Sequence, residues 1–253
     1  MKNFKQFFLT IILFVSLSTT SFAQFTLGIS TGFGMPAPPS TSLDPYFVQV
    51  EQNGDLEVLS ATLGAGINFN ANIGYNFSSN VGLHLNVNYL MGIKGSLYQY
   101  IDQIKIDQTF KSNSLSFAPH LTVSTANDSK VNFYAKFGPI ISLPKTITEI
   151  TVDVIPGVST YEYQKGMALG FLGGLGLDIA FSDMIGLFTE LETRMLNWQP
   201  KQLANTETTT GLPLDPTVTF SKEISSSSTD FEQQTIALSS IVLNVGVRFK
   251  FGE

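Results

Sequence analysis

The chain has 253 residues, with 20 acidic and 14 basic side chains and a formal net charge of −6. It contains no cysteine, which excludes disulfides and thiolate metal sites, and an acidic chain without basic clusters argues against nucleic acid as a partner. Beyond the first residues no apolar run is long enough for a transmembrane helix, so any membrane crossing must be made by strands.

The first 23 residues have the pattern of a secretory signal. Lys2 and Lys5 precede an apolar core from Phe7 to Leu17, and Ser21-Phe22-Ala23 has small residues at both recognition positions. This pattern predicts a signal peptide cleaved after Ala23, because the core is too short for a retained anchor. No twin-arginine pair is present, so we expect export by the Sec route. Residues 1–23 are therefore the expected signal peptide, and residues 24–253 the expected single domain.

Eight later segments alternate apolar residues with small or polar ones. The clearest runs from Leu63 to Phe77, where the odd positions are apolar and the even positions are Gly or Asn. Successive side chains of a strand point to opposite faces, so such a segment has one apolar and one polar face. The predicted strands are 25–35, 63–77, 81–92, 114–123, 131–143, 169–181, 186–198 and 241–251. Pro119, on the apolar face of the fourth, predicts a bulge or a locally missing ladder bond.

The connections between these segments alternate in length. Long connections cover about 36–61, 93–113, 144–165 and 199–233, and tight turns cover 78–80, 126–129 and 182–183. Short periplasmic turns and long outer loops are typical of outer-membrane barrels. The sequence thus predicts an all-β, eight-stranded antiparallel up-and-down transmembrane β-barrel with both termini in the periplasm. A soluble lipocalin-like barrel also has eight strands, but its apolar face points inward around a ligand. Here the Gly, Asn and charged face suits a narrow lumen, and the Leu and Phe face suits lipid.

With its signal peptide, eight strands, three tight turns and the terminal run Val245-Gly246-Val247-Arg248-Phe249-Lys250-Phe251, the chain resembles the small OmpA/OmpX-like outer-membrane barrels. Its strands, rich in glycine and asparagine, look like the versions of that family from the Bacteroidota. The resemblance covers residues 24–253 and rests on the pattern. It implies a Gram-negative cell envelope, contact with outer-membrane lipid and lipopolysaccharide, and insertion by the barrel-assembly machinery.

Seven charged residues are expected to project into one narrow lumen: Lys136, Asp178, Glu190, Glu192, Arg194, Arg248 and Lys250. Because the last two strands are neighbours, we expect Glu190 and Glu192 to meet Arg248 or Lys250. A gated ion path is the functional alternative, but eight strands leave little room for a pore, which favours a structural polar plug. The two glutamates also form a carboxylate pair, but a filled lumen provides neither the accessible cleft nor the raised pKa that glycosidase chemistry requires.

His84 and His120 are the only two histidines, and both are expected inside the lumen toward its periplasmic end. Two imidazoles could bind a metal or serve acyl transfer, but hydrogen-bonded lumen residues are the simpler interpretation. We therefore expect no catalytic, cofactor-binding or metal-binding set, and no cofactor. A lipid-remodelling outer-membrane enzyme using a His or Ser remains an alternative, and a narrow channel or carrier for small solutes is another.

Aromatic residues gather near the strand ends, as expected of two membrane-anchoring belts. They are Phe25, Tyr75, Phe77, Phe133, Phe181, Phe249 and Phe251 at the periplasmic ends, and Tyr89 and Trp198 at the outer ends. Trp198 has lumen parity, so its place in a belt requires a bulge near Leu196 or a position in the loop.

The loops carry six further aromatic residues, Tyr46, Phe47, Tyr98, Tyr100, Tyr161 and Tyr163. These could contact a surface protein or glycan, or pack the loops upon themselves. The sequence as a whole predicts a non-enzymatic barrel that acts in envelope integrity or surface interaction through four long outer loops.

Overall fold

The computed structural model describes residues 24–37, 48–50, 56–58, 63–101, 104–125, 130–153, 155–208, 217–221, 231–232 and 235–252. These residues form sixteen strands. Over the same residues there is no helix with the length and apolarity needed to cross a membrane. The predicted signal peptide, residues 1–23, lies outside the described residues.

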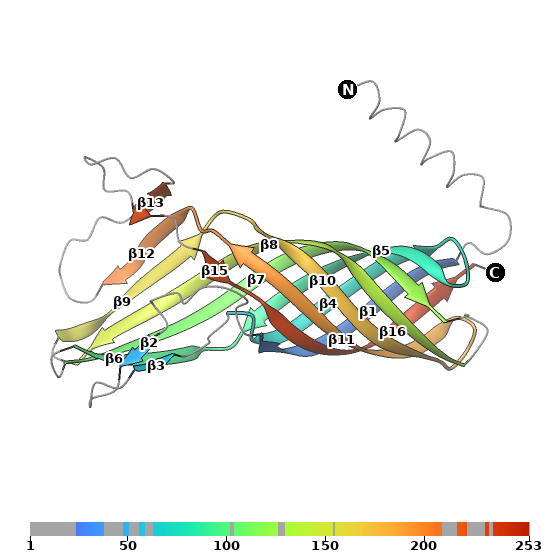
Figure 1. The fold of residues 1–253 in the computed structure, drawn as a ribbon, viewed down its shortest axis with the longest axis horizontal. Coiled ribbons are helices and arrows are strands. Elements are labelled where there is room, and N and C mark those ends of the chain that lie inside the picture. Colours follow the sequence, from blue (N-terminus) through green and yellow to red (C-terminus); the bar gives the residue numbers. More distant parts are fainter. Residues whose placement is uncertain are drawn as a thin grey trace, which may run out of the picture.

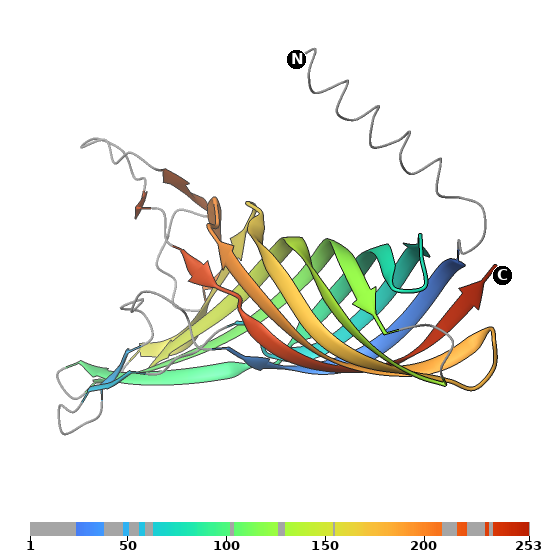
Figure 2. The ribbon, with the colours of Figure 1, turned by 45° about the vertical axis from the view of Figure 1, so that its right-hand side comes forward.

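Eight strands close into a barrel (Figure 1, Figure 2). They are β1 (Gln24–Pro36), β4 (Gly66–Asn76), β5 (Val81–Gly92), β7 (Ile104–Ser124), β8 (Val131–Val152), β10 (Ala168–Ala180), β11 (Ile185–Trp198) and β16 (Ser240–Phe251). Each pairs antiparallel with the next, and β16 pairs with β1 to close the ring. The predicted eight-stranded antiparallel barrel is confirmed, and each of the eight predicted segments supplies one of its strands.

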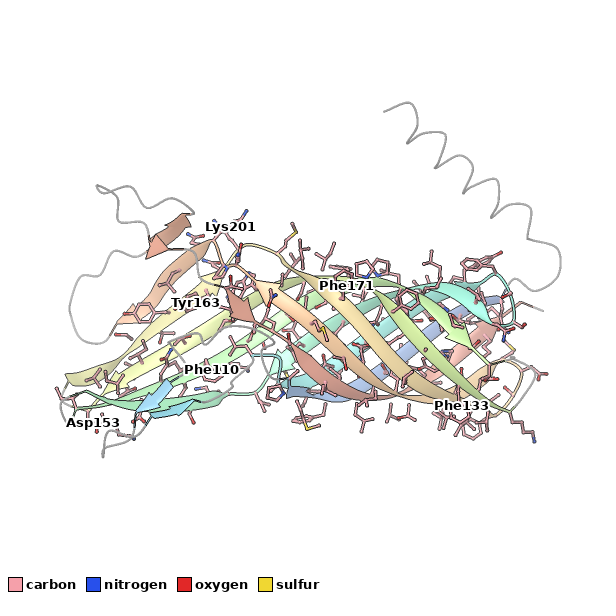
Figure 3. The ribbon with its side chains drawn as sticks, viewed as in Figure 1. Phe110, Phe133, Asp153, Tyr163, Phe171 and Lys201 are labelled. Atoms are coloured by element: carbon pink, nitrogen blue, oxygen red, sulfur yellow. The ribbon has the colours of Figure 1, made fainter. Side chains whose placement is uncertain are left out.

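The two faces of these strands differ as the alternation predicts. Outward Leu, Ile, Met and Phe side chains are exposed, with Phe171 at 71 % and Leu175 at 68 %, while the positions between them are largely buried. Phe133 and Phe171 lie on the outside of the barrel (Figure 3). The turn end of this outer face is aromatic: the rings of Phe25 and Phe251 lie 6.2 Å apart. The polar and small residues therefore fill the lumen.

Two of the predicted turns have the same local construction. The hydroxyl of Ser78 accepts the backbone N–H of Val81 at 3.1 Å, and that of Ser182 accepts the N–H of Ile185 at 3.1 Å. A serine hydroxyl that satisfies a turn N–H favours a tight reversal. The third predicted turn, 126–129, lies outside the described residues.

Five neighbouring barrel strands continue beyond the barrel as a sheet at the loop end. β7 and β8 are 21 and 22 residues long. β6 (Gly95–Ile101) follows β5, β9 (Ile155–Gln164) precedes β10, and β12 (Gln202–Thr208) follows β11. We call β6, β9, β12, residues 104–112 of β7 and residues 145–152 of β8 the wing; it occupies the left of Figure 1. Short strands β2 (Val48–Val50), β3 (Leu56–Val58), β13 (Thr217–Ser221), β14 (Phe231–Glu232) and β15 (Ile236–Ala237) complete the sheet.

The wing corrects the expectation of long irregular connections at 93–113 and 144–165. These stretches are mostly paired: Phe110 lies opposite Thr148, and Thr148 opposite Tyr161. They are rich in Thr, Ile, Val and Tyr, which favour strands even where every second residue is polar. Between β9 and β10, Lys165 and Gly166 have φ of 60° and 83° and mark the point where the chain passes from wing to barrel.

The segment 63–77 is shorter as a strand than predicted. β4 begins at Gly66, and Leu63 is 6 % exposed instead of facing outward. The backbone N–H of Leu63 donates to Ala237 O, so Leu63 lies across the loop-end opening of the barrel. The first three residues of the predicted strand therefore belong to the closure of the loop end.

Pro119 interrupts the ladder between β7 and β8 as predicted. Phe117 pairs with Ile141 and Leu121 with Phe137, and no pairing is formed between these two positions. The register is the same on both sides of the gap, so it is a locally missing ladder and not a bulge. Pro139 lies in the matching gap of β8, and neither proline has an N–H to donate.

Candidate functional site

All seven predicted lumen charges point into the barrel. Six are buried, and the seventh, Arg248, has a side chain 13 % exposed. The buried six are Lys136, Asp178, Glu190, Glu192, Arg194 and Lys250. An unpaired charge at such positions would be costly, so the pairing of these groups determines what the lumen can do.

The middle of the lumen holds a closed cycle of hydrogen bonds, which we call the central ring. Lys136 Nζ donates to Glu190 Oε1 at 2.8 Å and to Glu192, and Arg194 Nε donates to Glu192. Two amides close the cycle from Glu190 back to Arg194: Asn244 donates to Glu190 at 3.1 Å, Asn70 donates to Asn244 at 3.1 Å, and Arg194 Nη2 donates to Asn70 at 3.4 Å. Two cations thus balance two carboxylates with every member bonded, the arrangement that a buried charge network requires.

A layer of asparagines holds the guanidinium of Arg194. Its Nη1 donates to Asn68 Oδ1 at 2.7 Å and to Asn88 Oδ1 at 2.6 Å. The Asn88 amide in turn donates to Asn70 at 2.8 Å. Sequence reasoning placed these asparagines on the polar face but did not identify them as ligands of an arginine. The signal available in the sequence was their position on the polar face, Asn68 and Asn70 on one predicted strand and Asn88 on the next.

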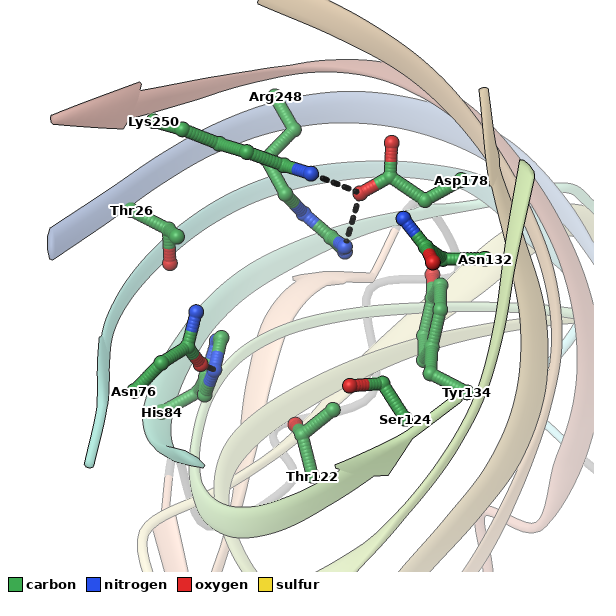
Figure 4. A pocket seen from close by; sticks show the side chains of 10 residues that line it. All are labelled: Thr26, Asn76, His84, Thr122, Ser124, Asn132, Tyr134, Asp178, Arg248 and Lys250. Atoms are coloured by element: carbon green, nitrogen blue, oxygen red, sulfur yellow. Dashed lines mark hydrogen bonds and ion pairs between the residues drawn. The ribbon is translucent and has the colours of Figure 1, made fainter. Parts of the chain in front are cut away.

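A second cluster lies nearer the turn end. Arg248 Nη1 donates to Asp178 Oδ2 at 2.7 Å, and Lys250 Nζ lies 3.8 Å from the same oxygen (Figure 4). The guanidinium carbon of Arg248 is 4.8 Å from the ring centre of Tyr134 and 4.7 Å from that of Phe188. An arginine between two aromatic faces gains cation–π attraction and loses mobility.

The expected pairing of Glu190 and Glu192 with Arg248 or Lys250 is wrong. In the β11–β16 ladder, Glu190 lies opposite Asn244, and Arg248 lies opposite Gly186. Arg248 and Lys250 thus lie two and three inward positions from Asn244 toward the turn end, where Asp178 is the acid within reach. Parity assigns residues to the lumen face, but the stagger between strands decides which of them share a level.

Glycines let the long side chains cross to their partners. Gly176 lies between Tyr134 and Glu190 in the ladder, and the Tyr134 hydroxyl donates to Glu190 Oε2 at 2.9 Å. Gly174 lies in the same way between Lys136 and Glu192. Each glycine leaves free the space that a side chain of the intervening strand would occupy.

The two histidines face each other on β5 and β7, with ring centroids 5.6 Å apart. His84 lies within hydrogen-bond distance of Asn72 Oδ1 (3.1 Å) and Asn76 Oδ1 (3.0 Å), and His120 Nδ1 lies 3.0 Å from Ala118 O. Both are buried. Within the described residues, no group of three or more His, Cys, Asp or Glu is placed to hold a metal ion.

Two small cavities lie beside these groups. One, of about 20 Å³, is lined by ten residues that include His84, Tyr134, Asp178 and Arg248 (Figure 4), and the other, of about 10 Å³, adjoins His120 and Glu190. In the first cavity Asp178 Oδ1, Thr26 Oγ1 and Arg248 Nε make no hydrogen bond to protein. Each space suits about one water molecule, which such polar atoms would hold.

An apolar cluster, which we call the outer cap, closes the loop end of the lumen. It consists of Leu63, Phe110, Ala118, Ile140, Ala168, Leu172, Leu196, Trp198, Ile236 and Leu238. β15 pairs with β11 beside Trp198, and the N–H of Leu238 donates to Leu196 O at 3.0 Å. The chain after residue 235 therefore crosses the mouth and seals it with side chains.

Trp198 is part of this cap and not of an outer aromatic belt. It is 0 % exposed, its Nε1 donates to Lys165 O at 3.2 Å, and it pairs with Ala168 without a shift in register. The assignment of Trp198 to an outer belt was wrong, because no bulge turns its side chain outward. The side chain points inward, as its place in the alternation of the strand predicts. Leu196 and Leu172 share that inward face, which makes the loop end of the lumen apolar.

Of the loop aromatics, Tyr161 and Tyr163 are described. Both lie on the wing face that continues the lumen, and Tyr163 packs against the outer cap. The opposite face carries paired charges, where hydrogen bonds from Lys94 and Thr109 hold the pKa of the Glu149 carboxyl below its usual range. Tyr46 and Phe47 and the side chains of Tyr98 and Tyr100 lie outside the described residues.

One solved outer-membrane barrel shares this fold, and two others align less well. The outer membrane protein OprG from Pseudomonas aeruginosa aligns with a TM-score of 0.51 at 12 % identity, over 92 % of this chain and 97 % of that one. Ail of Yersinia pestis aligns with a TM-score of 0.38 at 10 % identity (91 % and 100 % covered), and Neisserial surface protein A with 0.37 at 14 % (91 % and 98 %). No protein-family model and no curated protein matches the sequence.

Proposed function

We propose that the protein is a non-enzymatic outer-membrane barrel of the small OmpA/OmpX-like kind, with a closed lumen, that acts in envelope integrity or surface interaction through its loop end. The observation that carries this proposal is the division of the molecule into an exposed apolar outside and a lumen filled by the central ring and the outer cap. Such an outside is stable only in hydrocarbon, and such a lumen leaves no continuous path for solutes.

The ends of the barrel support an orientation. β1 starts and β16 finishes at the end with the short turns, while the wing lies at the other (Figure 1). In outer-membrane barrels the short turns face the periplasm. We therefore propose periplasmic termini, residues 1–23 as a cleaved signal peptide, and insertion by the barrel-assembly machinery. The glycine- and asparagine-rich lumen favours a version of the type found in Bacteroidota.

The wing is the part proposed to meet a surface partner, a protein or a glycan. It extends five barrel strands as a hydrogen-bonded sheet, which holds its side chains in fixed positions. Binding residues on a rigid support lose less conformational entropy on contact than residues of an unstructured loop. Of the two wing tyrosines whose side chains are described, Tyr161 is better placed to contribute, because Tyr163 packs against the outer cap.

Two measurements on the extracted protein test this proposal. Gel mobility before and after heating should shift, as expected of a barrel that stays folded in detergent, and planar-bilayer recordings should show no conductance above that of the bare membrane. Steady conductance would overturn the closed lumen and favour the channel. Altered lipid A mass spectra in expressing cells, absent in the His84→Ala and His120→Ala variants, would favour the enzyme.

A further inference from the structure

Five lysines surround part of the barrel where the wing begins, one for each strand that continues into it. They are Lys94 between β5 and β6, Lys111 on β7, Lys145 on β8, Lys165 between β9 and β10, and Lys201 between β11 and β12. We call them the rim lysines. Lys111 is half-buried and the other four are exposed. Figure 3 shows Lys201 at this junction.

The strand register makes the rim lysines one continuous row. Gly95 pairs with Phe110, so Lys94 and Lys111 are cross-strand neighbours. Lys145 pairs with Asn113, two residues from Lys111. Ala168 pairs with Ser142, and this register places Lys165 at the level of Lys145. Gln164 pairs with Gln202, which brings Lys165 beside Lys201. With neighbouring strands about 4.8 Å apart, the row is about 20 Å long.

Directly below the row, the outer face is mostly apolar. The next outward residues toward the barrel after Lys94, Lys145 and Lys165 are Ile93, Leu143 and Met167, each an exposed large hydrophobic side chain. On the other two strands polar residues come first: Asn113 precedes Leu115, and Gln199 and Asn197 precede Met195. If this face lies in hydrocarbon, the row of lysines lies at the level of the headgroups. A lysine there can lay its methylenes on the apolar surface and keep its ammonium among polar groups.

Two of the five ammonium groups already have acidic partners. Lys94 lies 2.8 Å from Glu149, and Lys145 lies 2.8 Å from Glu162. These pairs are partly exposed and therefore weak. For Lys111, Lys165 and Lys201, no acid lies within ion-pair distance among the described residues. The row thus has an excess of positive charge next to the apolar surface.

The turn end of the barrel differs. Its outer face carries the aromatic residues, and Lys130 is its one outward basic residue in the described part of the chain, since Arg248 and Lys250 point inward. An aromatic border suits an ordinary headgroup region. The lysines are thus concentrated at only one of the two borders. This asymmetry indicates that the two leaflets differ in charge, with the more anionic leaflet at the loop end.

We propose that the rim lysines bind the phosphate groups of anionic lipids in the leaflet at the loop end. The inference rests on the proposed function, because it requires that the barrel spans a bilayer. Each ammonium offers three donors to phosphate oxygens and needs no fixed geometry. A basic residue near an anionic lipid surface strengthens binding by roughly fivefold. The unpaired Lys111, Lys165 and Lys201 are the main contributors.

The test measures lipid binding by the protein extracted from the membranes of expressing cells into a zwitterionic detergent. The probe is lipid A, a glycolipid with two phosphates, followed by native mass spectrometry or calorimetry. Replacing both Lys111 and Lys201 by Gln should weaken binding about 20-fold, and replacing both by Arg should preserve it. The matched control, Lys105→Gln with Lys130→Gln, removes the same charge elsewhere and should bind like the wild type.

Two further arms identify the ligand. Lipid A without its phosphates should bind the wild type and the Lys111/Lys201 variant equally weakly, and inorganic phosphate should bind far more weakly than lipid A. Equal binding of lipid A by wild type and variant overturns the inference, as does inorganic phosphate binding as tightly as the lipid. If the wild type shows no heat-modifiable mobility and does not enter vesicles, the proposed membrane barrel itself is wrong. If wild type and variants do enter vesicles, a negative result in the lipid-binding measurement contradicts only the inference about the rim lysines.

Discussion

At the scale of single residues, the lumen is built from long side chains that cross glycines. Tyr134 passes over Gly176 to Glu190, and Lys136 passes Gly174 to Glu192. A glycine in a strand normally weakens it, because it has no side chain to pack. In this lumen the missing side chain is replaced by one from a neighbouring strand, so the glycine-rich composition and the charge network depend on each other.

Gly176→Ala should therefore destabilise the barrel. A β-carbon at this position would lie 2.2 Å from Tyr134 Cζ and 2.5 Å from its hydroxyl oxygen, so the ring must move and its bond to Glu190 must break. We expect the free energy of unfolding to fall by about 3 kcal/mol. Urea titration in detergent measures it. Gly173→Ala, where no atom lies within 4 Å of the added carbon, is the control and should change stability by less than about 0.5 kcal/mol.

Lys136→Met should be more harmful still, because it leaves Glu190 and Glu192 without their shared cation. Breaking a buried pair by removing one partner costs about 3–5 kcal/mol of unfolding free energy. Adding Glu190→Gln to the same chain should restore much of it, because Glu192 then remains paired with Arg194 and no buried charge is left in excess. Lys145→Met, which breaks a partly exposed pair, should cost less than about 1 kcal/mol. Equal stability of wild type and Lys136→Met in the titration would show that the central ring is not structural.

At the scale of elements, the strands of the wing side are longer than a bilayer requires. A strand needs about 9–11 residues to cross the hydrocarbon, and β7 and β8 have 21 and 22. Their extensions keep the alternation of the barrel: Phe110, Thr146 and Thr148 lie on the lumen side and Lys111 and Lys145 on the other. The loop end is thus a continuation of the same sheet.

Amide hydrogen exchange distinguishes this sheet from ordinary loops. Residues 146–152 of β8 are paired on both sides, with β7 and with β9. Their amides should exchange at least about 100-fold more slowly than in the unfolded chain, though faster than amides of the barrel. Mass spectrometry of the same peptides from the urea-unfolded protein provides the reference. Exchange at the unfolded rate would show that the wing is not held in detergent solution.

At the scale of the whole molecule, the chain is sorted into an apolar outside, a polar centre and an apolar seal at one end only. The outer cap separates the central ring from the loop end, while the small cavities lie toward the turn end. Buried charges cost least where water can approach from one side. The water-sized spaces of the lumen therefore lie on the turn-end side of the central ring, and the outer cap closes the lumen toward the loops.

The single tryptophan reports this arrangement directly. Because Trp198 lies in the outer cap, lipids that carry bromine on their chains should quench its fluorescence only weakly at every bromine depth. A variant with Trp198→Phe and Phe171→Trp moves the reporter to the outer face, where the ring at position 171 is 71 % exposed, and should be quenched strongly. Strong quenching of the wild type would place Trp198 in lipid and contradict the cap.

The sequence by itself determined the eight strands of the barrel, their order, the two tight turns that the structure describes and the face of nearly every barrel residue, because these follow from a period of two and from local turn chemistry. Only the tertiary structure decided that Arg248 meets Asp178, that Lys136 lies between Glu190 and Glu192, and that Trp198 seals the mouth. These depend on the axial stagger between strands, which barrel closure sets and which no single strand encodes.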